Sequence, residues 1–461
     1  MASMVGKRPW PESSRMPHIP AVARYTLTGA KVPRTLVDGD IADAVCDAED
    51  CVALDITIDH GRIAGLYPAG TAPETGPKVD LAGRQVWPTF IDMHAHLDKG
   101  HVIPRIQPDG TLHGGFALTV ADWPRWTPQD IALRMEFGLK CAYAHGVSAI
   151  RTHLDSVTLA QSQTGFSVFA AMRRGWADRV DLQAVAITPL DSYLTDLGPQ
   201  LADLTAAHGG ILGGVTDTLE RGENGTYDQL DYALDIMFAL ARDRGLDVDL
   251  HVDQTDDLAA FTIPNIARSR IRSGFQGRVV CDHCVNLSLQ PDDVIAQTLA
   301  LARDAGLGFV PMPTPMMYLM DRKPGRTPRW RGVTAAKEII AAGLPLAVGG
   351  DNCRDAWFAY GDHDMLDTWK QAIRVFQTDA PLTGAPDMAT RTPADLIGRP
   401  DLGRIGLGLP AKLVIFSARS LNSLMCRDQA DRIVLNNGVR VTDPLPLHED
   451  LARALGIDSS V

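Results

Sequence analysis

The chain has 461 residues, of which 45% are hydrophobic and 22% charged, and its formal net charge is -12. This length allows two or three average domains or one α/β barrel with an appendage, and the acidic excess disfavours binding to nucleic acid or to anionic membranes. The 7 scattered cysteines fit a reducing compartment, and no apolar run reaches the roughly 20 residues of a transmembrane helix, so we expect a soluble, cytoplasmic protein.

The two ends of the chain have a β-rich texture. Residues 1–23 contain several prolines and no apolar signal-peptide segment, so we expect a partly ordered leader. Residues 24–87 alternate short β-like runs with Gly/Asp turns, and the same texture returns at 405–445. We predict that these two segments form one small discontinuous β-sandwich domain, followed by a C-terminal tail at 446–461.

The middle of the chain, residues 88–404, alternates apolar strand candidates with helical stretches. The helical stretch 127–146, for example, begins at a cap-like threonine and ends at a glycine. This alternation predicts an α/β fold, a (β/α)8 barrel of the TIM type. The strand candidates are 89–98, 147–157, 181–189, 209–217, 246–254, 278–284, 307–313 and 344–352.

Histidines and acids gather where these strands end, at the barrel face that carries active sites. His94 and His96 are two residues apart on one strand, so their side chains share a face. Histidines also end the fifth and sixth strands, at His251 and His283, and Asp351 ends the eighth. Three imidazoles and a carboxylate with room for water are typical ligands of a catalytic divalent metal, which lowers the pKa of the bound water. The pattern therefore predicts a metal site at the barrel mouth.

Together with these residues, several further motifs resemble the amidohydrolase superfamily and, within it, its cytosine deaminase-like branch. The motifs are GTLHGGF (110–116), VSAIRTHLDSV (147–157), RWRGVTAAKEII (329–340), GGDNCRDAWFAYG (349–361) and GLGLPAKLVIF (406–416). The resemblance implies one divalent ion, zinc or iron, held by His94, His96, His251 and Asp351. It also implies that His283 orients the attacking hydroxide or the substrate, and that Asp351 moves the proton of the water. Two-metal members usually carry a bridging lysine at the fourth strand, and the segment 209–222 has none.

Three positions depart from the pattern of that branch. Gln254 stands where the branch has a proton-shuttling glutamate, Pro189 falls near its cytosine-binding glutamine, and Asn352 replaces a second aspartate. An amide cannot relay a proton as a carboxyl group can. Either another acid carries the proton, or the substrate needs no ring protonation, or activity has been lost. The changes argue against cytosine itself as the substrate.

Two further residues are candidates for the substrate pocket. Trp357 follows the last strand and would stack on a flat ring, or else simply pack in the core. Lys99 follows the first strand and reaches either the pocket rim or solvent. With Gln254, Asn352 and Pro189, these side chains are the predicted catalytic and substrate-binding wall.

These observations lead to a hypothesis for function with two alternatives. The leading hypothesis is a metal-dependent hydrolase that cleaves a C–N bond of a small nitrogen heterocycle and releases ammonia. The alternatives are a hydrolase of a cyclic amide or an N-alkylamino substituent, and a metal-binding protein without activity. The expected partner is a small-molecule substrate, and a homo-oligomer is compatible with the composition.

Overall fold

The computed structural model describes residues 16–41, 44–218, 227 and 229–457, so most of the predicted leader lies outside the described residues. Contacts divide the chain into two compact units, Met1–Trp87 with Ile405–Val441 and Pro88–Arg404 with Thr442–Val461. Along the described residues, none of the helices has the length and apolar character needed to cross a bilayer.

The first unit contains two four-stranded sheets, in the orders β3-β2-β1-β4 and β15-β14-β13-β5. In the second sheet an N-terminal strand pairs with C-terminal strands. Beside this pairing the Phe416 N–H donates a hydrogen bond to the Gln85 carbonyl oxygen, with an N···O distance of 3.0 Å. The small sheets are therefore built from both ends of the chain, as predicted. Their strands are β1 (Arg24–Pro33), β2 (Cys51–Asp59), β3 (Arg62–Pro68), β4 (Lys78–Asp80), β5 (Val86–Pro88), β13 (Leu413–Ile415), β14 (Ile433–Asn436) and β15 (Val439–Arg440).

The second unit is a nearly closed, TIM-like barrel around a seven-stranded sheet in which neighbours in space are neighbours in sequence. All its pairings are parallel, and every residue of β6, β10, β11 and β12 is buried, as expected for a sheet covered on both faces. The strands are β6 (Phe90–Ala95), β7 (Val147–Asp155), β8 (Asp181–Ile187), β9 (Ile211–Val215), β10 (Val248–Val252), β11 (Val279–His283) and β12 (Leu307–Val310). They confirm the first seven predicted strands.

The eighth predicted strand, 344–352, is wrong as a strand. The segment closes the barrel only through isolated bridges, from Leu346 to Phe309 on β12 and from Asp351 to Ala95 on β6. Pro345 cannot donate a ladder hydrogen bond. At Gly349 the segment passes so close to β6 that a Cβ there would lie 2.6 Å from the Cβ of His94. The close approach requires glycine, and it replaces regular pairing at the point where the metal-site residues meet.

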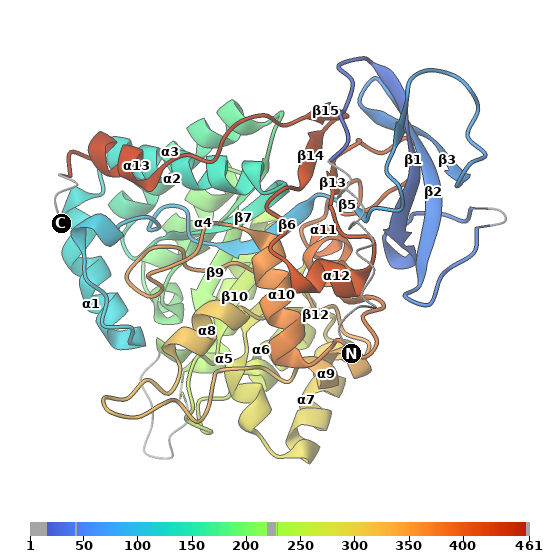
Figure 1. Ribbon diagram of the computed structural model, residues 1–461. Helices are drawn as coiled ribbons and strands as arrows, with labels where there is room; N and C mark the ends of the chain where they lie inside the picture. The colour runs from blue at the N-terminus through green and yellow to red at the C-terminus, as the bar shows by residue number, and fades with distance from the viewer. Residues whose placement is uncertain (1–15, 42–43, 219–226, 228, 458–461) are drawn as a thin grey trace, which may run out of the picture. The chain divides into compact units, whose positions relative to one another are not determined.

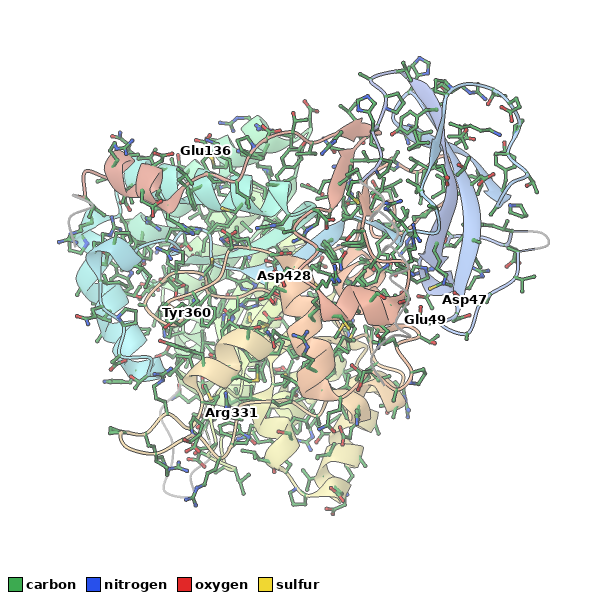
Figure 2. The ribbon with its side chains drawn as sticks, in the orientation of Figure 1. Asp47, Glu49, Glu136, Arg331, Tyr360 and Asp428 are labelled. Atoms are coloured by element: carbon green, nitrogen blue, oxygen red, sulfur yellow. The ribbon has the colours of Figure 1, made fainter. Side chains whose placement is uncertain are left out.

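The helices of the second unit pack on the outside of the barrel sheet, with successive helices in contact (Figure 1). The predicted helix at 127–146 is confirmed as α2, whose N-cap Thr127 accepts a hydrogen bond from the Asp130 N–H. On its outer side Glu136 pairs with Lys140 at 3.0 Å, while Met135 and Leu139 are buried (Figure 2). The α-helices are α1 (Leu112–Asp122), α2 (Pro128–Ala144), α3 (Leu159–Trp176), α4 (Leu197–Ala207), α5 (Leu230–Arg244), α6 (Ile263–Ser273), α7 (Asp292–Asp304), α8 (Pro313–Leu319), α9 (Ala336–Ala341), α10 (Met365–Phe376), α11 (Arg391–Leu396), α12 (Leu421–Cys426) and α13 (His448–Ala454).

The close approach at Gly349 gives a testable prediction. Gly349→Ala places a methyl group 3.2 Å from the backbone N and O of His94, which have no freedom to move aside. We expect this overpacking to lower the free energy of unfolding by about 1–3 kcal/mol in urea titrations. The matched control is Gly175→Ala in α3, where a Cβ meets nothing within 4 Å, and which should be neutral or slightly stabilising. Equal stabilities of the two variants would contradict the role assigned to Gly349.

Candidate metal centre and substrate pocket

His94 and His96 lie on β6 and at its end, and hydrogen bonds fix the orientation of both rings. His94 Nδ1 lies 2.6 Å from Asp282 Oδ2, and His96 Nδ1 lies 3.2 Å from the carbonyl oxygen of His153. A carbonyl oxygen only accepts, so His96 Nδ1 must be the donor. The Asp282 carboxylate fixes His94 in the same way, which is the usual outer-shell arrangement of metal-binding histidines. In each neutral ring the proton is therefore on Nδ1, and Nε2 presents a lone pair.

The two Nε2 atoms converge with a carboxylate oxygen of Asp351. His94 Nε2 and His96 Nε2 are 3.3 Å apart, and Asp351 Oδ1 lies 3.6 Å and 3.2 Å from them. All three atoms are acceptors, so they repel one another unless a cation lies between them. Ligands bound at about 2.0–2.2 Å in tetrahedral geometry lie about 3.3–3.6 Å apart, so these three atoms fit a metal ion.

Other histidines complete a buried cluster around these atoms. The rings of His251 and His283 have their centroids 4.6 Å and 5.2 Å from that of His94. Neither ring nitrogen of His283, nor Nδ1 of His251, nor either oxygen of Asp351 has a hydrogen-bond partner among the described residues. Burial lowers the pKa of His96, His251 and His283 well below the ordinary value, so these imidazoles are neutral and able to bind a metal. The cluster is a buried His/Asp metal-binding centre.

The sequence pattern favoured a supporting role over a ligand role for His153 and did not select Asp282, and both residues belong to the centre. The His153 ring stacks on that of His94 with centroids 3.9 Å apart, and neither of its nitrogens has a hydrogen-bond partner among the described residues. His94, His153, His251 and Asp282 accordingly form a second possible ligand group. In that group Asp282 is already engaged by His94 Nδ1, which favours the group that contains Asp351.

A buried polar network continues below Asp282. Arg151 pairs with Asp249 at 2.7 Å, and both side chains are at most 1% exposed. Burial and the neighbouring Asp282 raise the pKa of Asp249 well above its usual range. Burial also raises the pKa of Asp282, to about 7, so both acids of this network bind a proton more readily than an exposed aspartate does.

The backbone is strained just after β10, at the end of β11 and in the eighth segment. Asp253, His283 and Asp351 adopt positive φ angles of 53°, 64° and 62°, which only glycine adopts readily. Each such residue costs about 1–3 kcal/mol and persists where the surrounding structure fixes it, as at active sites.

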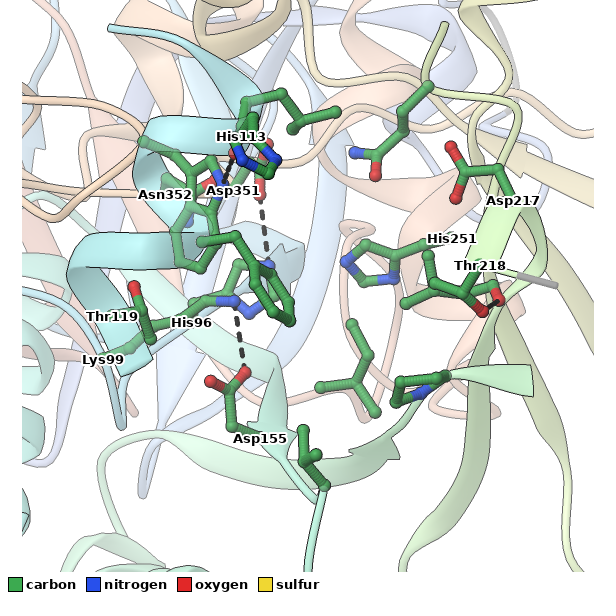
Figure 3. Close-up of a pocket in the computed structure, with 18 of the residues that line it drawn as sticks. His96, Lys99, His113, Thr119, Asp155, Asp217, Thr218, His251, Asp351 and Asn352 are labelled. Atoms are coloured by element: carbon green, nitrogen blue, oxygen red, sulfur yellow. Dashed lines mark hydrogen bonds and ion pairs between the residues drawn. The ribbon is translucent and has the colours of Figure 1, made fainter. Parts of the chain in front are cut away.

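The centre forms the floor of a pocket of about 400 Å³ in the barrel mouth (Figure 3). A ring-sized ligand fits such a volume. The apolar part of its wall includes Phe116 and Val120 of α1, Ile187, Val215 and Leu319. His94 and His283 are buried and do not line the pocket, whereas the remaining predicted site residues do. These lining residues are His96, His251, Asp351, Gln254, Lys99, Asn352, Pro189 and Trp357.

Several of the predicted substrate-binding side chains are held by neighbours. Lys99 is buried, and its Nζ lies 3.2 Å from Asp155 and 4.4 Å from the centre of the Trp357 ring. Burial alone would lower the Lys99 pKa, but Asp155 and Asp98 outweigh it and raise the pKa, so Lys99 is charged. The Asn352 amide donates to Asp355 at 2.7 Å. This side of the pocket is a preorganised polar wall rather than a flexible rim.

The opposite side of the pocket carries an acid that the sequence analysis did not select. Asp217 follows β9, lines the pocket together with Gln254, and turns its carboxylate toward the interior on the side of His251 (Figure 3). Asp253, in contrast, is fully buried and accepts hydrogen bonds from Thr262 Oγ1 at 2.6 Å and Thr262 N at 2.9 Å. Asp253 therefore lies behind the pocket wall, whereas Asp217 lines the pocket itself.

Comparisons with known proteins agree with this geometry. Residues 108–441 match the model of the Amidohydrolase family. The chain is 43% identical over 442 residues to a pterin deaminase of Rhizobium rhizogenes (strain K84 / ATCC BAA-868), covering 95% of this chain and 98% of that protein. It is 25% identical over 377 residues to the N-isopropylammelide isopropyl amidohydrolase of Pseudomonas sp. (strain ADP), covering 78% and 87%. The crystal structure of 5-methylcytosine deaminase from Klebsiella pneumoniae liganded with phosphonocytosine superposes with a TM-score of 0.76 at 22% identity, over 90% of this chain and 97% of that one.

The two possible ligand groups make different predictions for metal binding. We expect His96→Ala to lose the bound metal, because it removes one of the three converging acceptors, and His153→Ala to retain it. The measurement is metal content per chain after dialysis of the purified variants, by elemental analysis. The opposite result, with metal lost in His153→Ala and kept in His96→Ala, would favour the group containing Asp282.

Proposed function

This chain belongs to the amidohydrolase family and is a metal-dependent deaminase of a nitrogen heterocycle, and we propose that the heterocycle is a pterin or a closely similar fused ring. The reaction replaces an exocyclic amino group by oxygen, so that water adds to the amino-bearing ring carbon, the C–N bond breaks and ammonia leaves. The observation that carries the proposal is the 43% identity, over 95% of this chain, to a protein named as a pterin deaminase.

The pocket supports a flat bicyclic substrate. Its volume of about 400 Å³ leaves room for a fused ring system, and its walls are largely apolar. Polar groups at the edges, including Thr188, Asp217, Thr218 and Asn352, can read the ring nitrogens and the oxo group of a pterin. Pro189 offers no such contact, which agrees with a substrate other than cytosine.

We propose that His94, His96, His251 and Asp351 hold a single divalent ion, zinc or iron. The convergence of His94 Nε2, His96 Nε2 and Asp351 Oδ1 supports this set, and His251 contributes from the adjoining pocket floor. When bound, the ion lowers the pKa of a water molecule and polarises the reacting carbon.

The residues of the chain then move the protons. Asp351 has two buried carboxylate oxygens without hydrogen-bond partners among the described residues, so one is available to accept the proton of the attacking water. The same group returns this proton to the departing amine. His283 lies in the same cluster, within 4.8 Å of Asp351 by its ligand atom, and hydrogen-bonds the developing oxyanion.

Ring protonation requires a further acid, because Gln254 is an amide. The carboxylates among the pocket-lining residues are Asp155, Asp217 and Asp351. Asp155 pairs with Lys99 and Asp351 serves the water, and Asp217 lines the same wall of the pocket as Gln254. We assign to Asp217 the transfer of a proton to a ring nitrogen, with Gln254 orienting the ring through its amide.

The substrate proposal predicts ammonia release from pterin. We expect the metal-loaded protein to turn over pterin with a kcat/KM at least about tenfold above that for aminopyrimidines and aminotriazines, because only the fused ring fills the pocket. Asp351→Ala should abolish turnover, whereas Asp304→Ala on the exposed end of α7 should not. Turnover confined to N-alkylamino rings would support the alternative hydrolase. A metal-loaded protein inactive on the whole panel would contradict the pterin assignment.

The proton assignment predicts a rescue. Asp217→Asn should lower kcat by about 10²–10⁴-fold and alter the alkaline limb of the pH–rate profile, because a general acid must be protonated to act. Adding Gln254→Glu to that variant should restore part of the rate, because it returns a carboxyl group to the same wall. Asp256→Asn, on an exposed neighbouring loop position, is the matched control. An Asp217→Asn enzyme of normal rate would exclude Asp217 as the acid.

A further inference from the structure

A second cluster of metal-binding side chains lies outside the pocket. His101, Cys353 and His363 each place one possible ligand atom within 4.8 Å of the others, and their exposed fractions are 1%, 4% and 7%. The Nε2 atoms of His101 and His363 are 3.1 Å apart. None of the three residues lines the pocket or contributes to the centre described above. We refer to these three residues as the outer cluster.

The backbone holds the outer cluster in a fixed arrangement. The His101 N–H donates to the Cys353 carbonyl at 3.1 Å, and the Val102 N–H donates to the Arg354 carbonyl at 2.9 Å. His101 and His363 both have positive φ angles, 62° and 53°. Two non-glycine residues in this conformation within one cluster indicate that the surrounding structure imposes their positions.

A helical glycine leaves space at the meeting point of the two rings. Gly138 is in the middle of α2, where glycine costs about 1 kcal/mol relative to alanine. A Cβ at this position would lie 2.9 Å from His363 Nε2 and 3.4 Å from His101 Nε2. Glycine at this position thus lowers the stability of the helix. It leaves open the space beside His363 Nε2 and His101 Nε2 that an alanine methyl group would fill.

We propose that the outer cluster is a second metal site, which binds Zn²⁺ or a similar thiophilic divalent cation through His101, His363 and Cys353. Two imidazoles and a thiolate are favoured zinc ligands, and the separation of the two Nε2 atoms is close to the roughly 3.3 Å of ligands around a tetrahedral ion. The fourth position is taken by water or by His448, a half-buried residue whose ring centroid lies 6.2 Å from that of His101. The donor set contains sulfur, unlike that of the pocket centre, so the two sites differ in metal preference.

The position of the outer cluster gives the ion a structural role. His101 is two residues after Lys99, and Cys353 is two residues after Asp351, and both Lys99 and Asp351 line the substrate pocket. An ion that joins His101 to Cys353 therefore braces the two segments that carry these pocket residues. Its loss should loosen the pocket without removing any group that touches the substrate.

Cobalt titration of the metal-free full-length protein tests the proposal. Co²⁺ bound to a thiolate gives a near-ultraviolet sulfur-to-cobalt charge-transfer band, which histidine and carboxylate ligands do not produce. We expect the unmodified protein to bind two equivalents of Co²⁺ and to show this band. Cys353→Ser should lose the band and one equivalent. Cys284→Ser, which removes the buried cysteine adjacent to His283, should keep the band.

Gly138→Ala gives a second test that leaves every ligand in place. We expect it to lose the charge-transfer band and the second equivalent, whereas Gly175→Ala in α3 should keep both. If Cys353→Ser does not fold, His363→Asn gives the same comparison. The proposal is overturned if the unmodified protein shows no band at saturating Co²⁺, which would leave a plain hydrogen bond between His101 and His363. It is equally overturned if the band survives in Cys353→Ser.

Discussion

The arrangement of the barrel mouth depends on the close approach of three hydrogen-bond acceptor atoms. His94 Nε2, His96 Nε2 and Asp351 Oδ1 lie within 3.6 Å of one another, and none can donate a hydrogen bond to another. Their mutual repulsion in a buried site is costly unless a cation is present. The polar network below, from Arg151 through Asp249 to Asp282, holds His94 in this arrangement. A bound cation would offset the electrostatic repulsion among these three atoms in the folded protein.

The same requirement explains why the barrel is not regular. Asp351 must reach β6 from the eighth segment, and the Asp351 N–H donates to the His94 carbonyl at 2.6 Å. Gly349 and Gly350 allow this approach, since side chains there would meet His94 and Asp92. The segment gives up strand pairing and adopts a left-handed backbone at Asp351. The eighth segment therefore lacks regular strand pairing at the place where it brings the Asp351 carboxylate to β6.

The sequence predicted the parts of this arrangement that follow from local patterns. Alternation of strands and helices predicted eight barrel strands, of which the structure has seven, and the two-residue spacing of His94 and His96 placed both side chains on one face. It could not predict that Gly349 would interrupt the last strand, because that depends on the distance to β6. Nor could it select Asp282, 188 residues from the histidine it orients, or Asp217, whose neighbours in the pocket come from other strands. The signal for Asp282 was its place beside His283 at a strand end.

Two segments, 94–103 and 349–363, run side by side and contribute residues to both the pocket centre and the outer cluster. The two clusters are therefore mechanically coupled through these segments. Near β6 they are joined by the Asp351–His94 hydrogen bond, and farther along by the pairing of His101 with Cys353. Gly100 lies between, where a Cβ would meet the carbonyl oxygens of Cys353 and His96 at 3.2 Å. Movement at the outer end is therefore transmitted to His94 and Asp351, which belong to the buried His/Asp centre. Because a displacement of about 1 Å in a catalytic group can cost about 10²-fold in rate, the ion proposed for the outer cluster would support catalysis by joining these segments rigidly, without contact with the substrate.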